Sequence, residues 1–279
     1  MLKREEINIR DPFVLTVPEE NCYYMYGTTS MFLGPRLEVF RSLDLENFEE
    51  PVQIFTIPEN FWGTELFWAP EVKKYNGLYY LTTTLMDPVS RVKGTQIMYS
   101  KSPAGPFQAV ANAPATPLEW ASLDGTLWWE DGKPWMIFCH EWGQVGDGTI
   151  ERIPLTDDLT AAAGEPVTLF HASEAPWCIE YNSEGFRGYV TDGPFLFYDR
   201  YDRLSMLWSS FSKDGYSMGV AYSSDNTLIG KWMQEDTPII SGRGGHGMIF
   251  EKLNGERYLA FHGPNDAHKE RAIFTPFNL

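Results

Sequence analysis

The chain has 279 residues and a formal net charge of −16, from 38 acidic and 22 basic side chains. Nucleic acid and anionic membrane surfaces bind clustered Lys and Arg, so this charge argues against both partners and favours a neutral ligand. Aromatic residues make up 15% of the chain, and aromatic rings together with carboxylates are typical of sites that bind sugars. We therefore expect an oligosaccharide as the partner.

Five short turn-forming motifs recur along the chain, each at the head of a run of apolar and aromatic residues. They are Arg10-Asp11-Pro12-Phe13, Ala69-Pro70-Glu71-Val72, Leu123-Asp124-Gly125-Thr126, Thr191-Asp192-Gly193-Pro194 and Gly245-His246-Gly247-Met248. If Asp11, Glu71, Asp124, Asp192 and His246 are equivalent points, the intervals between them are 60, 53, 68 and 54 residues. Such a period is typical of a repeat that contains one small sheet.

Hairpin signals follow the motifs. Asn76-Gly77, Asp131-Gly132 and Asn254-Gly255 each separate two strand-like runs, and such dipeptides favour tight hairpin turns. Further short runs complete four antiparallel strands per repeat, with almost no helical periodicity. The pattern predicts an all-β fold, a five-bladed β-propeller that spans residues 1–279 as a single domain; a β-sandwich is the alternative. We expect the last strand, near residues 272–277, to pair with the amino-terminal segment and close the ring.

The innermost strands of a propeller start at a common end, so the residues that open each repeat are expected to converge there. Asp11, Asp124 and Asp192 would then face one pocket, with Glu71 and His246 available from the other two repeats. Inverting hydrolysis of a glycosidic bond needs one carboxylic acid to protonate the leaving oxygen and one carboxylate to activate water. A third carboxylate nearby would keep the acid protonated through like-charge repulsion.

The five motifs, in this order, resemble those of family 43 glycoside hydrolases over essentially the full chain. The matching segments are Ile9-Arg10-Asp11-Pro12, Trp68-Ala69-Pro70-Glu71-Val72, Ser122-Leu123-Asp124-Gly125-Thr126, Asp192-Gly193-Pro194-Phe195-Leu196 and Gly245-His246-Gly247. The resemblance implies a five-bladed propeller and inverting hydrolysis, chiefly of α-L-arabinofuranosides and β-D-xylosides, with some galactan-active members.

The resemblance also implies a role for each acidic residue. Asp11 would be the general base, Asp192 the general acid, and Asp124 the residue that tunes and orients the acid. The family usually has Glu before Gly-Pro, whereas Asp192 is one methylene shorter and has less reach. Glu141 is therefore an alternative acid, because the strand before it runs antiparallel to the strand opened by Asp124 and returns to the same end of the blade.

Several further residues are candidates for substrate binding. Rings near the expected pocket mouth could stack on sugars, although packing between blades would explain them equally well: Phe32, Trp68, Trp142 and Trp177. Arg271 resembles an arginine that family members place against substrate hydroxyls, with a simple ion pair as the alternative. His246, between two glycines, can approach the axis closely, and in related propellers this position lies beneath the pocket, sometimes next to calcium. We expect no cofactor and no catalytic metal, with a structural calcium near His246 as the alternative.

The expected function is an inverting, exo-acting glycoside hydrolase that removes a terminal sugar, α-L-arabinofuranose first, from oligosaccharides. A β-xylosidase or an exo-galactosidase is the enzymatic alternative. A carbohydrate-binding propeller that has lost hydrolysis is the alternative of another class, suggested by the shorter acid at Asp192. The oligomeric state is open, and a partner subunit could complete the pocket rim.

The cysteines and the amino terminus bear on location. Cys22, Cys139 and Cys178 are odd in number and lack paired spacing, which is typical of reduced thiols. The charged start of the chain has no apolar leader region. We expect a cytoplasmic protein, or a secreted one if a leader has been removed, with no membrane-spanning segment.

Overall fold

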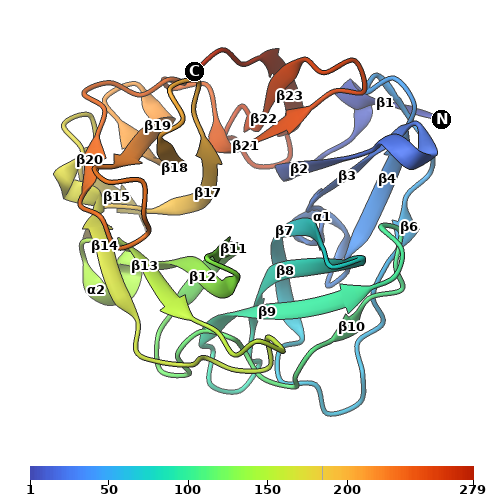
Figure 1. Ribbon diagram of the computed structural model, residues 1–279, viewed down its shortest axis with the longest axis horizontal. Coiled ribbons are helices and arrows are strands. Elements are labelled where there is room, and N and C mark those ends of the chain that lie inside the picture. The colour runs from blue at the N-terminus through green and yellow to red at the C-terminus, as the bar shows by residue number, and fades with distance from the viewer. Residues whose placement is uncertain (184) are drawn as a thin grey trace.

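Five antiparallel sheets stand around a central axis (Figure 1), which confirms the predicted five-bladed β-propeller. The structure is a computed structural model that describes residues 1–183 and 185–279; the side chains of Ser30 and Phe32 also lie outside the description. The chain passes around the ring once, so the first blade, in blue, lies beside the last blade, in red (Figure 1).

In each blade the strands run in chain order from the axis to the perimeter. The first blade contains β2 (Arg10–Val17), β3 (Cys22–Thr28), β4 (Glu38–Ser42) and β5 (Asn47–Phe48), with β1 (Leu2–Lys3) on β5 and β6 (Val52–Gln53) on β4. The second contains β7 (Glu65–Tyr75), β8 (Leu78–Met86), β9 (Lys93–Ser100) and β10 (Gln108–Ala109). The third contains β11 (Ser122–Glu130), β12 (Lys133–His140), β13 (Thr149–Pro154) and β14 (Val167–His171).

The fourth blade contains β17 (Asp192–Tyr198), β18 (Leu204–Ser212), β19 (Gly215–Ser223) and β20 (Trp232–Gln234), and the fifth contains β21 (Gly245–Glu251), β22 (Arg257–Gly263) and β23 (Arg271–Pro276). A small hairpin, β15 (Tyr181–Ser183) and β16 (Phe186–Gly188), precedes the fourth blade. Helices are short: α1 (Ser30–Leu33), α2 (Trp142–Val145) and the 3₁₀ turns η1 (Arg4–Glu6), η2 (Pro18–Glu20) and η3 (Ala172–Glu174).

The ring closes differently from the sequence-based expectation. In the described residues the fifth blade has three strands rather than four, and β23 pairs with β22 but not with an amino-terminal strand. β1 instead takes the free edge of β5 in the first blade. The first and last blades are joined by the Ile9 N–H, which donates to the Glu270 carbonyl at 3.3 Å, and by the ion pair of Arg10 with Glu270 at 2.8 Å.

Each innermost strand carries a β-bulge at its motif. In β2, Arg10 pairs with Thr28 but Phe13 pairs with Tyr26, so three residues of the inner strand span two of its partner. The other four innermost strands show the same shift. One residue in each bulge has a left-handed φ of 45° to 56°: Asp11, Ala69, Asp124, Gly193 and His246. The motifs are therefore bulges within strands, which re-aim side chains, and not turns ahead of them.

The register of these bulges corrects the assumed equivalence of the five positions. The left-handed residue is Ala69 in the second blade and Gly193 in the fourth, so Asp192 lies one residue before the position of Asp11 and Asp124. Glu71 comes after the bulge, where it pairs with Thr82. In the other blades that register holds residues deeper in the channel: Phe13, Thr126, Phe195 and Met248.

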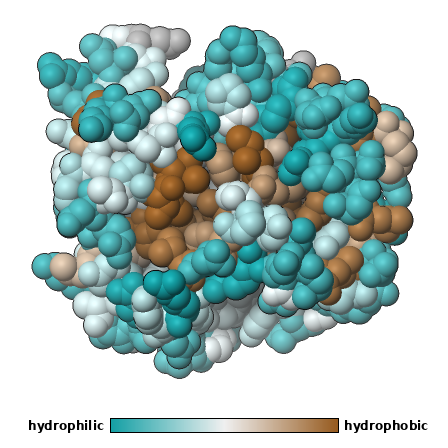
Figure 2. Space-filling view, turned by 90° about the horizontal axis from the view of Figure 1, so that it is seen from above, coloured by the Kyte–Doolittle hydropathy of each residue, from teal (hydrophilic) through white to brown (hydrophobic). Residues whose placement is uncertain are grey.

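Apolar side chains of neighbouring blades form the core. The largest fully buried ones include Trp208, Phe138 and Tyr26, and the clusters extend across blade boundaries. On the side of the ring where the last blade lies, polar residues cover most of the surface and apolar residues gather towards the middle of the view (Figure 2). Among the described helices, none is long and apolar enough to cross a membrane.

Candidate active site

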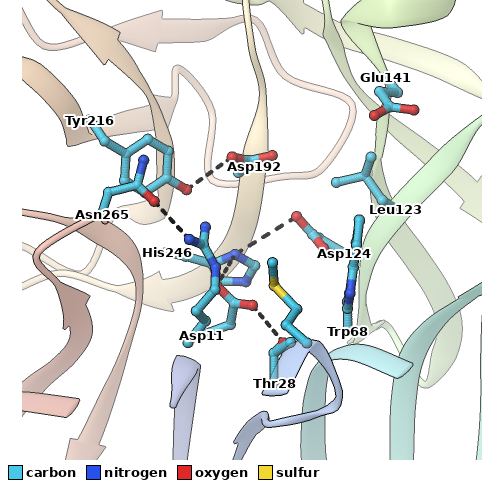
Figure 3. Close-up of a pocket in the computed structure, with 12 residues that line it drawn as sticks. Asp11, Thr28, Trp68, Leu123, Asp124, Glu141, Asp192, Tyr216, His246 and Asn265 are labelled. Atoms are coloured by element: carbon cyan, nitrogen blue, oxygen red, sulfur yellow. Dashed lines mark hydrogen bonds and ion pairs between the residues drawn. The ribbon is translucent and has the colours of Figure 1, made fainter. Parts of the chain in front are cut away.

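A cavity of about 290 Å³ opens at the end of the axis where the bulges lie. All five innermost strands contribute to it, because each bulge turns its residues towards the axis (Figure 3). Its lining consists of Arg10, Asp11, Thr28, Met31, Trp68, Leu123, Asp124, Glu141, Asp192, Tyr216, His246 and Asn265. In a regular strand, consecutive side chains point to opposite faces, yet Arg10 and Asp11, like Leu123 and Asp124, both line the cavity. The bulge thus lets one strand supply two neighbouring side chains.

Asp11 is held in its ionised form. The Thr28 hydroxyl donates to its Oδ2 at 2.6 Å, and Nδ1 of His246 lies 3.2 Å from its Oδ1. Burial alone would raise the pKa of this carboxyl, but the charges of His246 and Arg10 and the contact with His262 hold that pKa well below its usual range. A carboxylate that stays charged can accept a proton from water.

Asp124 lies between the third and fourth blades. The peptide N–H of Gly193 donates to its Oδ2 at 3.1 Å, and its own N–H donates to Oγ1 of Thr84 at 2.8 Å. Burial, with the like charges of Asp192 and Asp11, raises the pKa of Asp124 to about 7, although His246 opposes the shift.

Asp192 is the third carboxyl. The Tyr216 hydroxyl donates to its Oδ2 at 2.9 Å (Figure 3). Burial raises the pKa of Asp192, the charge of Asp11 adds to the rise, and His246 and the Tyr216 hydroxyl oppose it. Because two close carboxyls cannot both ionise without a large penalty, Asp124 and Asp192 together retain a proton more readily than free aspartates do.

His246 supplies a positive charge among these acids. Burial lowers its pKa, but the charges of Asp11, Asp124 and Asp192 outweigh that effect and raise it. Its ring lies so close to Gly193 that a Cβ there would come within 2.5 Å. Within the described residues, no group of three or more His, Cys, Asp or Glu side chains is arranged to hold a metal ion.

Arg10 is the cavity's arginine. Its Nη1 donates to Oδ1 of Asn265 at 2.9 Å and to Oε1 of Glu270 at 2.8 Å. Arg271, the arginine expected from the sequence, lies outside the cavity lining and donates to the Glu5 carbonyl, to Asn8 and to the Glu270 carbonyl. Arg271 starts the last strand of the fifth blade and bonds to the chain's first residues, which explains why it does not reach the axis.

A rim of three side chains borders the cavity on the side of the second and third blades. Nζ of Lys93 is hydrogen-bonded to Glu141 and lies 5.4 Å from the centre of the Trp68 ring. Trp68 and Glu141 line the cavity, as expected. The ammonium group of Lys93 thus holds the carboxylate of Glu141 in place.

Three other predicted contacts lie away from the cavity. Glu71 is buried below it and accepts a hydrogen bond from Thr126 at 2.5 Å, since its register lies after the bulge. Trp142 packs edge-on against Tyr181 of the small hairpin. Trp177 is buried against Trp208 with ring centres 5.0 Å apart, so it packs in the core rather than lining the pocket mouth. The side chain of Phe32 lies outside the described residues.

The sequence reasoning missed six residues that line the cavity: Arg10, Thr28, Met31, Leu123, Tyr216 and Asn265. Arg10 and Leu123 could have been found, because each directly precedes a predicted catalytic aspartate and a bulge can present both. Tyr216 and Asn265 carry no local signal. Tyr216 reaches Asp192 from two strands away in the same blade, and Asn265 of the fifth blade reaches Arg10 of the first.

Comparison with known proteins places these features in a family. The model of glycosyl hydrolases family 43 matches residues 6–275. The crystal structure of an endo-arabinase from Bacteroides thetaiotaomicron VPI-5482 is 38% identical, with a TM-score of 0.93 over 100% of this chain and 97% of that one. An endo-1,4-beta-xylanase structure from the same organism is 26% identical, with a TM-score of 0.75 over 96% of this chain and 90% of that one.

A curated relative is more distant. The extracellular endo-alpha-(1->5)-L-arabinanase 1 of Bacillus subtilis (strain 168) is 24% identical over 170 residues, which are 57% of this chain and 52% of the relative. The match thus spans about half the length of that relative. Its name gives an extracellular location, so this comparison lends no support to the cytoplasmic location expected from the sequence. With the family model matching nearly the whole chain, the protein belongs to glycosyl hydrolase family 43.

Proposed function

We propose that this protein is an inverting glycoside hydrolase that cleaves α-L-arabinofuranosidic bonds and releases a terminal arabinose. The observation that carries the proposal is that three carboxyls at one cavity have pKa values shifted in opposite directions. The surroundings hold the pKa of Asp11 low, while burial and like charges raise the pKa of Asp124 and Asp192. An inverting glycosidase needs this combination of a charged base and a protonated acid.

In the proposed reaction, Asp11 takes a proton from the water that attacks the anomeric carbon. Asp192 gives its proton to the leaving glycosidic oxygen as the bond breaks. Asp124 binds the Gly193 N–H, holds the neighbouring acid in place and disfavours its ionised form. Lys93 binds Glu141, so Glu141 is less free to donate a proton, and this favours Asp192 as the acid.

The choice of arabinose rests on the relatives, and the choice of a terminal unit rests on the cavity. Both a 38% identical structure and the curated relative bear the name of an arabinan-cleaving enzyme. The cavity of about 290 Å³ lies at the small end of ligand pockets, which span about 300–1,000 Å³. That size suits one sugar unit better than a polymer segment. Trp68 offers a ring face, and Arg10 and Asn265 offer polar groups to sugar hydroxyls.

A second candidate is endo action on arabinan, which the names of the same two relatives favour. A xylosidase is a further alternative, favoured by the xylanase relative. An exo-galactosidase and a binding-only propeller remain as rivals from the sequence. The presence of Asp11, Asp124 and Asp192 at one cavity argues for hydrolysis, because a module that only binds sugar gains nothing from an activated water.

The test uses linear α-1,5-linked arabino-oligosaccharides labelled at the reducing end, with xylo- and galacto-oligosaccharides alongside. Exo action releases arabinose while the labelled chain shortens one unit at a time, whereas endo action yields labelled short oligomers from the start. NMR of the first product should show an inverted anomeric centre. Binding of these sugars without any cleavage would replace the proposal with the binding-only propeller.

A further inference from the structure

Tyr216 touches the proposed acid from two strands away in the same blade. It lies in β19 of the fourth blade, is 4% exposed, and its hydroxyl donates to Oδ2 of Asp192 at 2.9 Å. Burial raises the pKa of the Tyr216 phenol well above its usual value, so the hydroxyl keeps its proton and remains a donor.

The packing around Tyr216 fixes its ring independently of Asp192. The ring stacks on His262 with centres 5.6 Å apart and an interplanar angle of 19°. On another side lies Gly245, where a Cβ would come within 2.7 Å of the Tyr216 ring. Phe211 packs at 5.4 Å between ring centres. The hydroxyl is therefore presented at a defined point, and the carboxyl of Asp192 is oriented against it.

We propose that Tyr216 is the positioning residue of the acid: by binding Oδ2 of Asp192, it leaves the transferable proton on Oδ1. The inference rests on the proposed hydrolysis. As the glycosidic C–O bond breaks, the proton moves from Oδ1 to the leaving oxygen, and the water that adds at the anomeric carbon gives its proton to Asp11. The hydroxyl of Tyr216 then stabilises the carboxylate that forms, and it gives a fixed orientation to an acid whose side chain is one methylene shorter than Glu.

Other charged or titratable groups also act on Asp192, so its titration is shared. Besides Tyr216 from β19, they come from β2, β11, β12 and β21: Arg10, Asp11, Asp124, Cys139 and His246. His246 and Arg10 favour the ionised acid, and Asp11 opposes it. The Tyr216 hydroxyl is the one group that an isosteric change can remove with the ring left in place.

The test is Tyr216→Phe, assayed on arabino-oligosaccharides and on an aryl arabinofuranoside with an activated leaving group. A hydrogen bond to a charged group is lost, so kcat on the oligosaccharide should fall about 10-fold. The aryl substrate needs little protonation and should change less than about 2-fold. The alkaline limb of kcat should move to higher pH, because the carboxylate of Asp192 loses a donor.

Tyr26→Phe is the matched control. Tyr26 is also buried and its hydroxyl donates to the Pro103 carbonyl at 2.6 Å, away from the cavity. Its loss should leave the pH limb and the ratio of the two substrates unchanged. If Tyr216→Phe lowers kcat equally on both substrates and leaves the alkaline limb of the pH profile in place, the proposal is overturned.

A second measurement is independent of activity. In protein labelled with ¹³C at the aspartate carboxyls, the Asp192 signal, assigned with Asp192→Asn, should titrate at higher pH in Tyr216→Phe than in the unmodified protein. An unchanged titration overturns the role of Tyr216 even if the enzyme cleaves arabinan. A shifted titration in a protein that cleaves no glycoside supports the Tyr216–Asp192 bond and overturns the proposed hydrolysis instead.

Discussion

The peptide N–H of Gly193 donates to Oδ2 of Asp124 at 3.1 Å, which joins the third blade to the fourth directly beside Asp192. Gly193 can do this because it has a left-handed φ of 54° and no side chain against the His246 ring. The bond makes the position of the proposed acid depend on the carboxyl that tunes it. It also ties the geometry of the site to the contact between two blades.

Substitution at Gly193 is expected to disturb both the site and the fold. In Gly193→Ala a Cβ would lie within 2.5 Å of the His246 ring at a φ that alanine adopts with strain. We expect a lower melting temperature and at least a 10-fold loss of kcat, since about 1–2 kcal/mol of strain accompanies the ring's displacement. Gly132→Ala, also at a left-handed φ but with open space around it, is the control; equal kcat values for the two variants would contradict the argument.

Asp11→Ala should abolish turnover. Removal of a general base costs typically about 10²–10⁴-fold in rate, and activated aryl substrates should suffer as much as natural ones because the water still needs activation. Steady-state kinetics on both substrates would check this. Asp158→Ala changes an exposed aspartate and should leave the rate unaltered; an Asp11 variant with near-normal kcat would remove Asp11 from the mechanism.

Asp192→Asn and Glu141→Gln separate the two candidate acids. The Asp192 variant should lose far more activity on oligosaccharides than on an aryl arabinofuranoside, because only the natural leaving group needs a strong proton donor. Glu141→Gln should affect both substrates mildly and alike. The opposite pattern would identify Glu141 as the acid.

The alkaline side of the pH profile should reflect the buried carboxyl pair. Burial raises the pKa of Asp124 to about 7, and burial also raises the pKa of Asp192. A group with a raised pKa loses its proton as pH rises through that value, so kcat should decline above about pH 7. The measurement is kcat against pH on an oligosaccharide. A decline that starts near pH 4, as for a free aspartate, would show that burial does not hold the proton.

Arg10→Lys should raise KM by about 10-fold, because lysine keeps the charge near Glu270 but loses the planar fork that can bind Asn265 and sugar hydroxyls together. Arg271→Lys is the matched change outside the cavity and should alter the melting temperature more than KM. If Arg271→Lys raises KM and Arg10→Lys does not, the assignment of the substrate arginine is reversed.

Removal of metal ions should not alter activity. His246 carries the positive charge among the acids, and no step of the proposed reaction needs another cation. Prolonged dialysis against EDTA followed by assay, with and without added calcium, checks this. A loss of activity that added calcium restores would contradict this prediction and support the structural calcium near His246.

The sequence by itself determined the propeller and the identity of the acidic side chains at its axis. Both follow from local sequence signals. Asn-Gly and Asp-Gly turns set the hairpins. Asp, Gly and Pro mark the bulges, since Asp and Gly tolerate a left-handed φ and Pro needs no partner for an N–H. Repetition of these signals placed Asp11, Asp124, Asp192 and His246 at one end.

Only the tertiary structure decided the register and the neighbours of these residues. A bulge shifts a strand by one residue, so Glu71 lies below the cavity and Asp192 lies one position ahead of its assumed equivalent. Arg10 meets Asn265 across 255 residues of sequence, and Tyr216 reaches Asp192 from two strands away in the same blade. Such contacts depend on how strands are ordered within a blade and how blades pack against one another, and no local pattern of residues encodes either arrangement.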